Sequence, residues 1–129
     1  HVDLNQGQAG LVFTIDGGGS AITTGFKGAV SVPYDCTIEG VTLLSCDSAV
    51  TSGSIVIDIW RDSYGNYAPT VADTITASAK PTLASDTKYT DAALQGWSKT
   101  LTAGDVLGFN VDSAATVTRT TLTLALRHR

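Results

Sequence analysis

The side chains best suited to nucleophilic or metal chemistry are few in this sequence, and they are poorly placed for it. The two histidines, His1 and His128, lie at the ends of the chain, and the two cysteines, Cys36 and Cys46, are ten residues apart. Ser-His and Cys-His catalysis needs a base within hydrogen-bond reach of the nucleophile. Zinc needs clustered Cys and His ligands. We therefore expect neither a nucleophilic active site nor a zinc site.

Carboxylates are the remaining candidates for acid–base work, because glycosidases use two of them across the scissile bond. Most aspartates stand beside turn residues, as in Asp16-Gly17, where turn formation accounts for them. Calcium would use Asp62 with Asn66, or Asp112 with nearby carbonyls, but no EF-hand spacing is present. We predict no catalytic residue, no bound metal and no cofactor, and hence a protein that is not an enzyme.

Aromatic residues next to polar ones suggest a different chemistry, the binding of a sugar. Tyr64 and Tyr67 alternate with Asp62 and Asn66, just after Trp60. Rings pack on sugar faces while amides and carboxylates take the hydroxyls. The alternative is that these rings pack onto the protein itself or onto a neighbouring subunit. We predict that any glycan site lies here, with the two tyrosines stacking and the polar pair hydrogen-bonding.

Strands must position these residues, because apolar side chains recur with period two. In 54–60 every odd position is Ile, which predicts one core face and one semi-exposed face. The same period appears in 105–111 and 116–126, and shorter runs cover 11–15, 29–32 and 36–44. Only 72–79 and 90–94 could hold a helical turn. The predicted core comprises Ile55, Ile57, Ile59, Leu107, Phe109, Leu122, Leu124 and Leu126.

Seven or eight such strands predict an all-β protein, a two-sheet antiparallel β-sandwich that is jelly-roll-like. Its long segment from Arg61 to Lys80 exceeds what a hairpin needs, and such loops often carry binding sites. We expect one sandwich domain over 10–129, preceded by a polar arm or linker remnant over 1–9. Both cysteines are expected to be reduced and buried, because one strand would hold them too far apart to bridge.

The composition of the chain limits the classes of molecule that it is expected to bind. The chain has 129 residues, of which 43% are hydrophobic and 16% charged, with a net charge of −4. That charge disfavours nucleic acid, whose affinity comes largely from neutralised phosphates. No apolar run approaches the roughly 20 residues of a spanning helix, so membrane insertion is not expected. The sequence lacks Met even at position 1, so His1 is not expected to be a natural start.

Several longer stretches resemble small β-sandwich domains of bacteriophage virion proteins, often tail-fibre or other minor structural proteins. They are residues 53–75, 80–82, 94–97 and 103–113, and the resemblance covers roughly 25–126. It implies a non-enzymatic virion domain at the tail or capsid surface, in contact with other virion proteins and assembled as a homotrimer.

Three functions remain open under this resemblance. The first, which is the main prediction with the other two as alternatives, is a distal receptor-binding domain of a tail fibre or baseplate that recognises a host-surface glycan. The second is a capsid decoration or head-fibre protein. The third is a carbohydrate-binding module of a larger enzyme. Binding to glycans would favour the first or third, and co-purification with heads would favour the second.

Overall fold

The computed structural model describes residues 7–46 and 53–129, which form strands and two 3-10 turns with no α-helix among them. The strands are β1 (Gln8–Asp16), β2 (Gly25–Ser31), β3 (Cys36–Ser45), β4 (Gly53–Ser63), β5 (Thr82–Asp86), β6 (Lys88–Asp91), β7 (Thr100–Leu101), β8 (Asp105–Ala115) and β9 (Arg119–His128). The 3-10 turns are η1 (Tyr64–Asn66) and η2 (Val71–Asp73). The predicted all-β class is confirmed.

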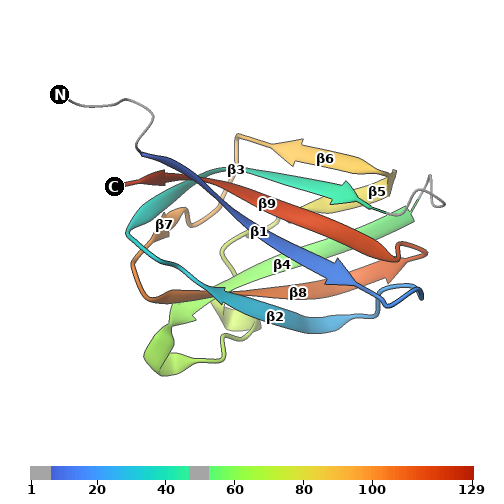
Figure 1. Ribbon diagram of the computed structural model, residues 1–129, viewed down its shortest axis with the longest axis horizontal. Coiled ribbons are helices and arrows are strands. Elements are labelled where there is room, and N and C mark those ends of the chain that lie inside the picture. The colour runs from blue at the N-terminus through green and yellow to red at the C-terminus, as the bar shows by residue number, and fades with distance from the viewer. Residues whose placement is uncertain (1–6, 47–52) are drawn as a thin grey trace.

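The strands pair into two antiparallel sheets packed face to face (Figure 1). One sheet has the order β1-β9-β3-β6, with the short β7 also paired to β3, and the other has the order β2-β8-β4-β5. With β7 set aside, these are the two four-stranded sheets of a jelly roll, in which the chain crosses repeatedly from one sheet to the other. The expected two-sheet sandwich is therefore confirmed, down to its jelly-roll strand order.

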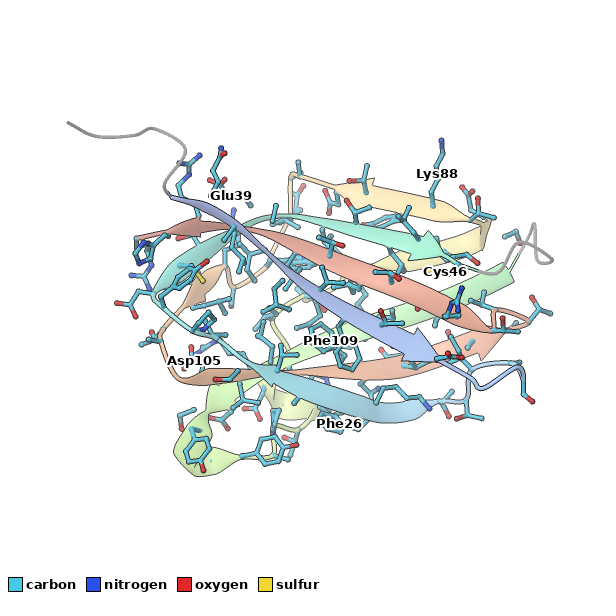
Figure 2. The ribbon with its side chains drawn as sticks, viewed as in Figure 1. Phe26, Glu39, Cys46, Lys88, Asp105 and Phe109 are labelled. Atoms are coloured by element: carbon cyan, nitrogen blue, oxygen red, sulfur yellow. The ribbon has the colours of Figure 1, made fainter. Side chains whose placement is uncertain are left out.

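The core lies between the sheets and is built from the alternate apolar positions. All eight predicted core residues are buried, each with at most 3% of its surface exposed. The ring of Phe109 on β8 stacks on Phe13 of β1 with 4.4 Å between centroids, so the two sheets are joined by an aromatic pair (Figure 2). The period-two pattern was thus sufficient to choose the inward face of three long strands.

Where the structure departs from the predicted elements, the cause is local. The last strand begins at Arg119 rather than at Thr116, because Thr116 takes a left-handed turn with φ of 68°. Residues 90–94 hold the end of β6 instead of a helical turn, and of 72–79 only residues 72 and 73, the end of η2, are helical. Strands β5, β6 and β7 were not predicted, since each has at most five residues and little alternation.

Cys36 is the first residue of β3 and Cys46 directly follows its last, and both are free thiols. A β-bulge at Glu39 shifts the register of β3 against β9 but leaves the strand continuous. Cys36 is buried as expected, and burial raises the pKa of its thiol. Cys46 is only half-buried, with its sulfur 3.1 Å from the Thr121 hydroxyl.

The N-terminal arm expected over 1–9 is only partly covered by the described residues. Of the polar arm expected over 1–9, residues 1–6 lie outside the described residues, while Gln8 and Ala9 already belong to β1. In the described part of the chain no helix is long and apolar enough to cross a membrane.

Candidate functional site

A surface hollow forms where the end of β4 meets β2 and β8. Its rim carries Tyr64 and Tyr67, which are 80% and 56% exposed. The remaining lining residues are Ala29, Val30, Ser31, Gly65 and Val106. The hollow has a volume of about 560 Å³, which falls in the range of small-molecule sites. The structure thus brings the two predicted tyrosines together over a floor of small side chains.

The tyrosines are held by a tight turn that follows β4 directly. The Tyr67 amide donates to the Tyr64 carbonyl over 3.2 Å, closing η1. Asp62 accepts from the Ser63 amide at 2.7 Å and from the Asn66 side-chain amide at 3.3 Å. Asp62 and Asn66 therefore brace the turn on which the rings sit, and they do not line the hollow themselves.

Trp60 occupies a neighbouring position with a different role. Its ring stacks on Phe26 of β2, with centroids 5.8 Å apart, and by strand alternation lies opposite the inward Ile59, on the side of that sheet away from the core. Its indole N–H donates to Asp58 over 3.0 Å. Gly108 lies beneath this pair, where an added Cβ would come within 3.1 Å of Pro69. The structure therefore places Trp60 in a packed cluster beside the hollow, outside its lining.

Asp58 is the polar residue that sequence analysis missed. Its strand alternation put it on a semi-exposed face, but the carboxylate is buried, with only 1% of the residue exposed. It accepts hydrogen bonds from the hydroxyls of Thr74 and Thr76 at 2.6 and 2.7 Å, besides Trp60. The expectation of semi-exposure was wrong for Asp58 because the segment after η2 folds back along β4, with Thr74 bridged to Trp60.

Electrostatics around Asp58 keep it ionised. Burial acts to raise the pKa of its carboxyl, but the hydrogen bonds from Thr74, Thr76 and Trp60, together with nearby Lys80, outweigh burial and lower the pKa. The Lys80 ammonium lies 3.8 Å from Asp58 and 2.6 Å from Asp112. Its hydrogen bond to Asp112 raises the pKa of Lys80. This network ties Thr74, Thr76 and Lys80, which follow the turn of the hollow in the chain, to β4 and β8.

The hollow itself offers hydroxyls and apolar surface rather than charge. None of its lining residues is ionic, and Tyr64, Tyr67 and Ser31 supply the hydroxyls. An ion pair between Arg61 and Asp105, at 3.3 Å, joins the end of β4 to the start of β8 without lining the hollow. Such a lining suits an uncharged ring with hydroxyl groups, in contact with the faces or edges of the two phenols.

The carboxylates considered for calcium are engaged elsewhere. Asp62 is bonded to Asn66, and Asp112 to Lys80 and Asn110. Among the residues that the structure describes, no three His, Cys, Asp or Glu side chains gather closely enough to hold a metal ion.

Part of the lining lay beyond sequence reasoning. Ala29, Val30 and Ser31 come from β2, and Val106 from β8, far from the tyrosines in the chain. Small residues in strands carry no signal of a site, so only the packing of the loop on the sheet identifies them.

No family model and no curated protein matches the chain. Its fold is similar to a chain in the capsid of Ralstonia phage GP4, with 13% identity over 96% of this chain and 86% of that one, at a TM-score of 0.49. A chain of the infectious bursal disease virus Gx strain matches at 12% identity over 99% of this chain but 37% of its own, with a TM-score of 0.41. A chain of the cyanophage Pam1 capsid matches at 13% identity, covering 95% and 81%, with a TM-score of 0.24.

Proposed function

We propose that this chain is a structural domain of a bacteriophage particle, mounted on the outside of the capsid as a decoration or head-fibre domain. The observation that carries the proposal is the strand order β1-β9-β3-β6 over β2-β8-β4-β5. This jelly-roll order is characteristic of viral capsid and lectin domains. Between a viral particle and a lectin, the resemblance of residues 25–126 to phage virion domains favours the viral particle.

The polar chemistry of the molecule supports a structural role. The carboxylates of Asp58 and Asp112 are bridged by Lys80, and the hydrogen bonds of Asp58 tie the loop to the sheet. A carboxylate held ionised by four donors is unsuited to give or take a proton near neutral pH. The network therefore serves to hold the fold, which is what a virion domain requires.

The outer face of the β1-β9-β3-β6 sheet suits contact with other proteins; we call it the bare face. In its middle rows Val12 pairs with Thr123, which pairs with Thr42, and Gly10 pairs with Ala125. Val12 is 57% exposed. These rows carry no charge, and charged residues such as Glu39 and Lys88 stand at the ends of the sheet (Figure 2). Depletion of charge is typical of the central part of an interface.

The location can be tested on particles that contain the chain. Heads and tails would be separated after controlled disruption, and the chain quantified in each fraction by mass spectrometry. We expect it in the head fraction at a fixed ratio to the major capsid protein. Recovery with tails alone would contradict the capsid location and favour a tail-fibre or baseplate domain.

A second function, glycan recognition, is favoured by one observation: Tyr64 is 80% exposed at the rim of a hollow of about 560 Å³. Tyr67 is also exposed at this rim, and neighbouring exposed aromatic rings over a hollow are typical of ligand-binding grooves. We propose that an uncharged pyranose is the ligand if the domain binds a receptor. The same hollow would serve a carbohydrate-binding module of a larger enzyme.

This second function is tested with Tyr64→Ala and Tyr67→Ala. Affinity for isolated host polysaccharide should fall at least about tenfold, the equivalent of one lost stacking contact of about 1.4 kcal/mol. Val71→Ala is the matched control, because Val71 is 67% exposed in the same segment but does not line the hollow. Unchanged binding by both tyrosine variants, with unchanged melting temperatures, would exclude the hollow as a glycan site.

Three-fold assembly, which the resemblance implies, stays a prediction. Counting chains in a particle map around local symmetry axes would decide it.

A further inference from the structure

The edge strands of the two sheets differ in how they are protected against pairing with another chain. Natural edges are kept short, bulged, or charged with Lys, because an exposed regular edge pairs with other strands. Strand β2 has a bulge at Lys27, and β5 is bulged against β4. Strand β6 has four residues including Lys88, and β7 has two. These four edges carry ordinary protection.

Strand β1 carries none of these devices. It has nine residues, Gln8–Asp16, and pairs with β9 in continuous register without a bulge. It contains no Lys, Arg or Pro, and its one charge is Asp16 at the end. Within residues 7–46 and 53–129, no strand pairs with its second edge. This is the one long, regular and nearly uncharged edge in the described structure.

The hydrogen-bonding groups of β1 that face away from β9 can be identified from the ladder. The His128 amide donates to the Gly7 carbonyl, and the Gly17 amide donates to the Thr118 carbonyl over 2.8 Å. Because the register between these two points is unbroken, the odd-numbered residues exchange bonds with β9. The backbone groups of the even-numbered residues therefore point to the free edge: Gln8, Gly10, Val12, Thr14 and Asp16.

The inward side of β1 is also incompletely covered. On the adjacent β9, the inward Leu122, Leu124 and Leu126 are at most 3% exposed. On β1, the inward Leu11 and Phe13 pack on the core but remain only partly buried. The apolar strip at this flank of the sandwich thus lacks cover from the side on which the free backbone groups lie.

We propose that β1 pairs antiparallel with β1 of a second copy of this chain, across a two-fold axis at Val12. In that register Gly10 lies opposite Thr14 of the other copy, and all free even-numbered groups meet even-numbered groups, so they form ladder bonds. Leu11 lies opposite Phe13 on the inward side, and each covers the other's exposed apolar surface.

The charges fit the same pairing, which is why a second copy is the occupant. Asp16 lies opposite the uncharged Gln8, so no like charges meet, and the centre of the strand is at Val12 with full overlap of all nine residues. The two sheets join into one continuous sheet of twice the width. The contact is isologous and closes on itself, so it yields a dimer and not a fibre. It does not depend on the virion role proposed above.

The test measures the mass of the purified chain by sedimentation, from low concentration to about 1 mM, where even a weak pairing is populated. Wild type should pass from 13.3 kDa to twice that mass. Val12→Lys sets two like charges opposite each other at the axis, and Val12→Pro removes an amide that faces only the free edge. Each should weaken the association at least about tenfold.

Thr123→Lys is the matched control. Thr123 pairs with Val12 and faces the same side of the sheet, one strand further in. The substitution Thr123→Lys therefore adds the same charge to the bare face without touching the edge strand. It should leave the dimer intact. Circular dichroism and melting of each variant at monomeric concentrations would confirm that the fold is kept, and Val12→Lys retains the backbone amide should Val12→Pro fail to fold.

Amide hydrogen exchange gives a second reading. The amides of Leu11 and Phe13 should be protected at every concentration, since they bond to β9, whereas those of Gly10, Val12 and Thr14 should become protected only as the chain associates. A wild type that stays monomeric at about 1 mM overturns the proposal and leaves the edge to a strand of another protein. A dimer that survives Val12→Lys, or one that Thr123→Lys dissociates, overturns it as well.

Discussion

The outer faces of the two sheets start from the same strand alternation and end in different environments. On the bare face, outward residues such as Val12 and Thr123 stay exposed or half-exposed. On the outer face of the β2-β8-β4-β5 sheet, which we call the covered face, residues 64–80 fold over the strands, and the outward Asp58 is buried. The difference teaches that an outward position in a strand is buried or exposed according to which other segment of the chain packs on it.

The covering segment is held by polar contacts as much as by apolar ones. At the centre of the covered face, Asp58 accepts hydrogen bonds from Thr74 and Thr76. Beside them, the rings of Phe26 and Trp60 stack, and Pro69 lies next to Gly108. The bare face has Thr side chains at matching positions, joined by contacts such as Thr42 to Thr90 at 3.1 Å. One face is thus covered by a segment of its own chain, and the other stays open to solvent in the described structure.

The largest effect should come from removing the carboxylate at the centre of the covered face. Asp58→Ala leaves the buried Thr76 hydroxyl, the more exposed Thr74 hydroxyl and the Trp60 indole N–H without their acceptor, and we expect a loss of about 3 kcal/mol in the free energy of unfolding. Thr123→Ala, at an outward position on the bare face, should change it by less than about 0.5 kcal/mol. Urea unfolding of both variants measures the contrast. Equal losses would show that the two faces do not differ.

A smaller effect is expected from glycines in equivalent outward positions. A Cβ at Gly108 would overlap the ring of Phe26 and crowd Pro69, so Gly108→Ala should push the ring off Trp60 and cost about 1–2 kcal/mol. Gly10→Ala on the bare face meets only the Leu124 carbonyl at 3.8 Å, an ordinary contact, and should be close to neutral. Thermal melts of the pair provide the comparison, and a neutral Gly108→Ala would mean that the cover is loosely packed.

Low pH should reduce the stabilisation that Asp58 contributes to the covered face. The pKa of Asp58 in the folded state lies below its ordinary value of 3.8, so its stabilisation is fully present above that value and is lost as the pH falls through the folded pKa. The difference in unfolding free energy between wild type and Asp58→Asn should be constant from pH 7 to about 5 and shrink below about 4. A difference that persists unchanged to about pH 3 would contradict the assigned protonation.

The smallest expected effect is a difference in the rate of thiol modification between Cys36, at the start of β3, and Cys46, just after its end. Burial raises the pKa of the Cys36 thiol and also shields it, while Cys46 is half-buried beside Thr121. A thiol reagent added to the native chain should therefore modify Cys46 first, and Cys36 only on a timescale of local opening. Peptide mapping after timed labelling reads both sites. Equal rates would indicate that the β3 end near Cys36 opens readily.

By itself the sequence determined the longer strands and the inward faces of β4, β8 and β9, but not the short strands β5, β6 and β7. Ile55, Ile57 and Ile59, like the Leu residues of β9, repeat with period two, and burial of such a row is a local property of a strand that any sandwich satisfies. The same alternation was enough to assign the all-β class. It also placed Tyr64 and Tyr67 after a rigid strand, where the structure finds them exposed.

Tertiary structure alone decided what lies on the outward faces. Whether Asp58 meets water or two threonine hydroxyls depends on the path of a segment 16 to 18 residues further along the chain. The floor of the hollow comes from β2 and β8, and the free edge of β1 follows from the strand order. These are contacts between residues distant in sequence, and no local periodicity encodes them, because many arrangements of loops and edges bury the same core equally well.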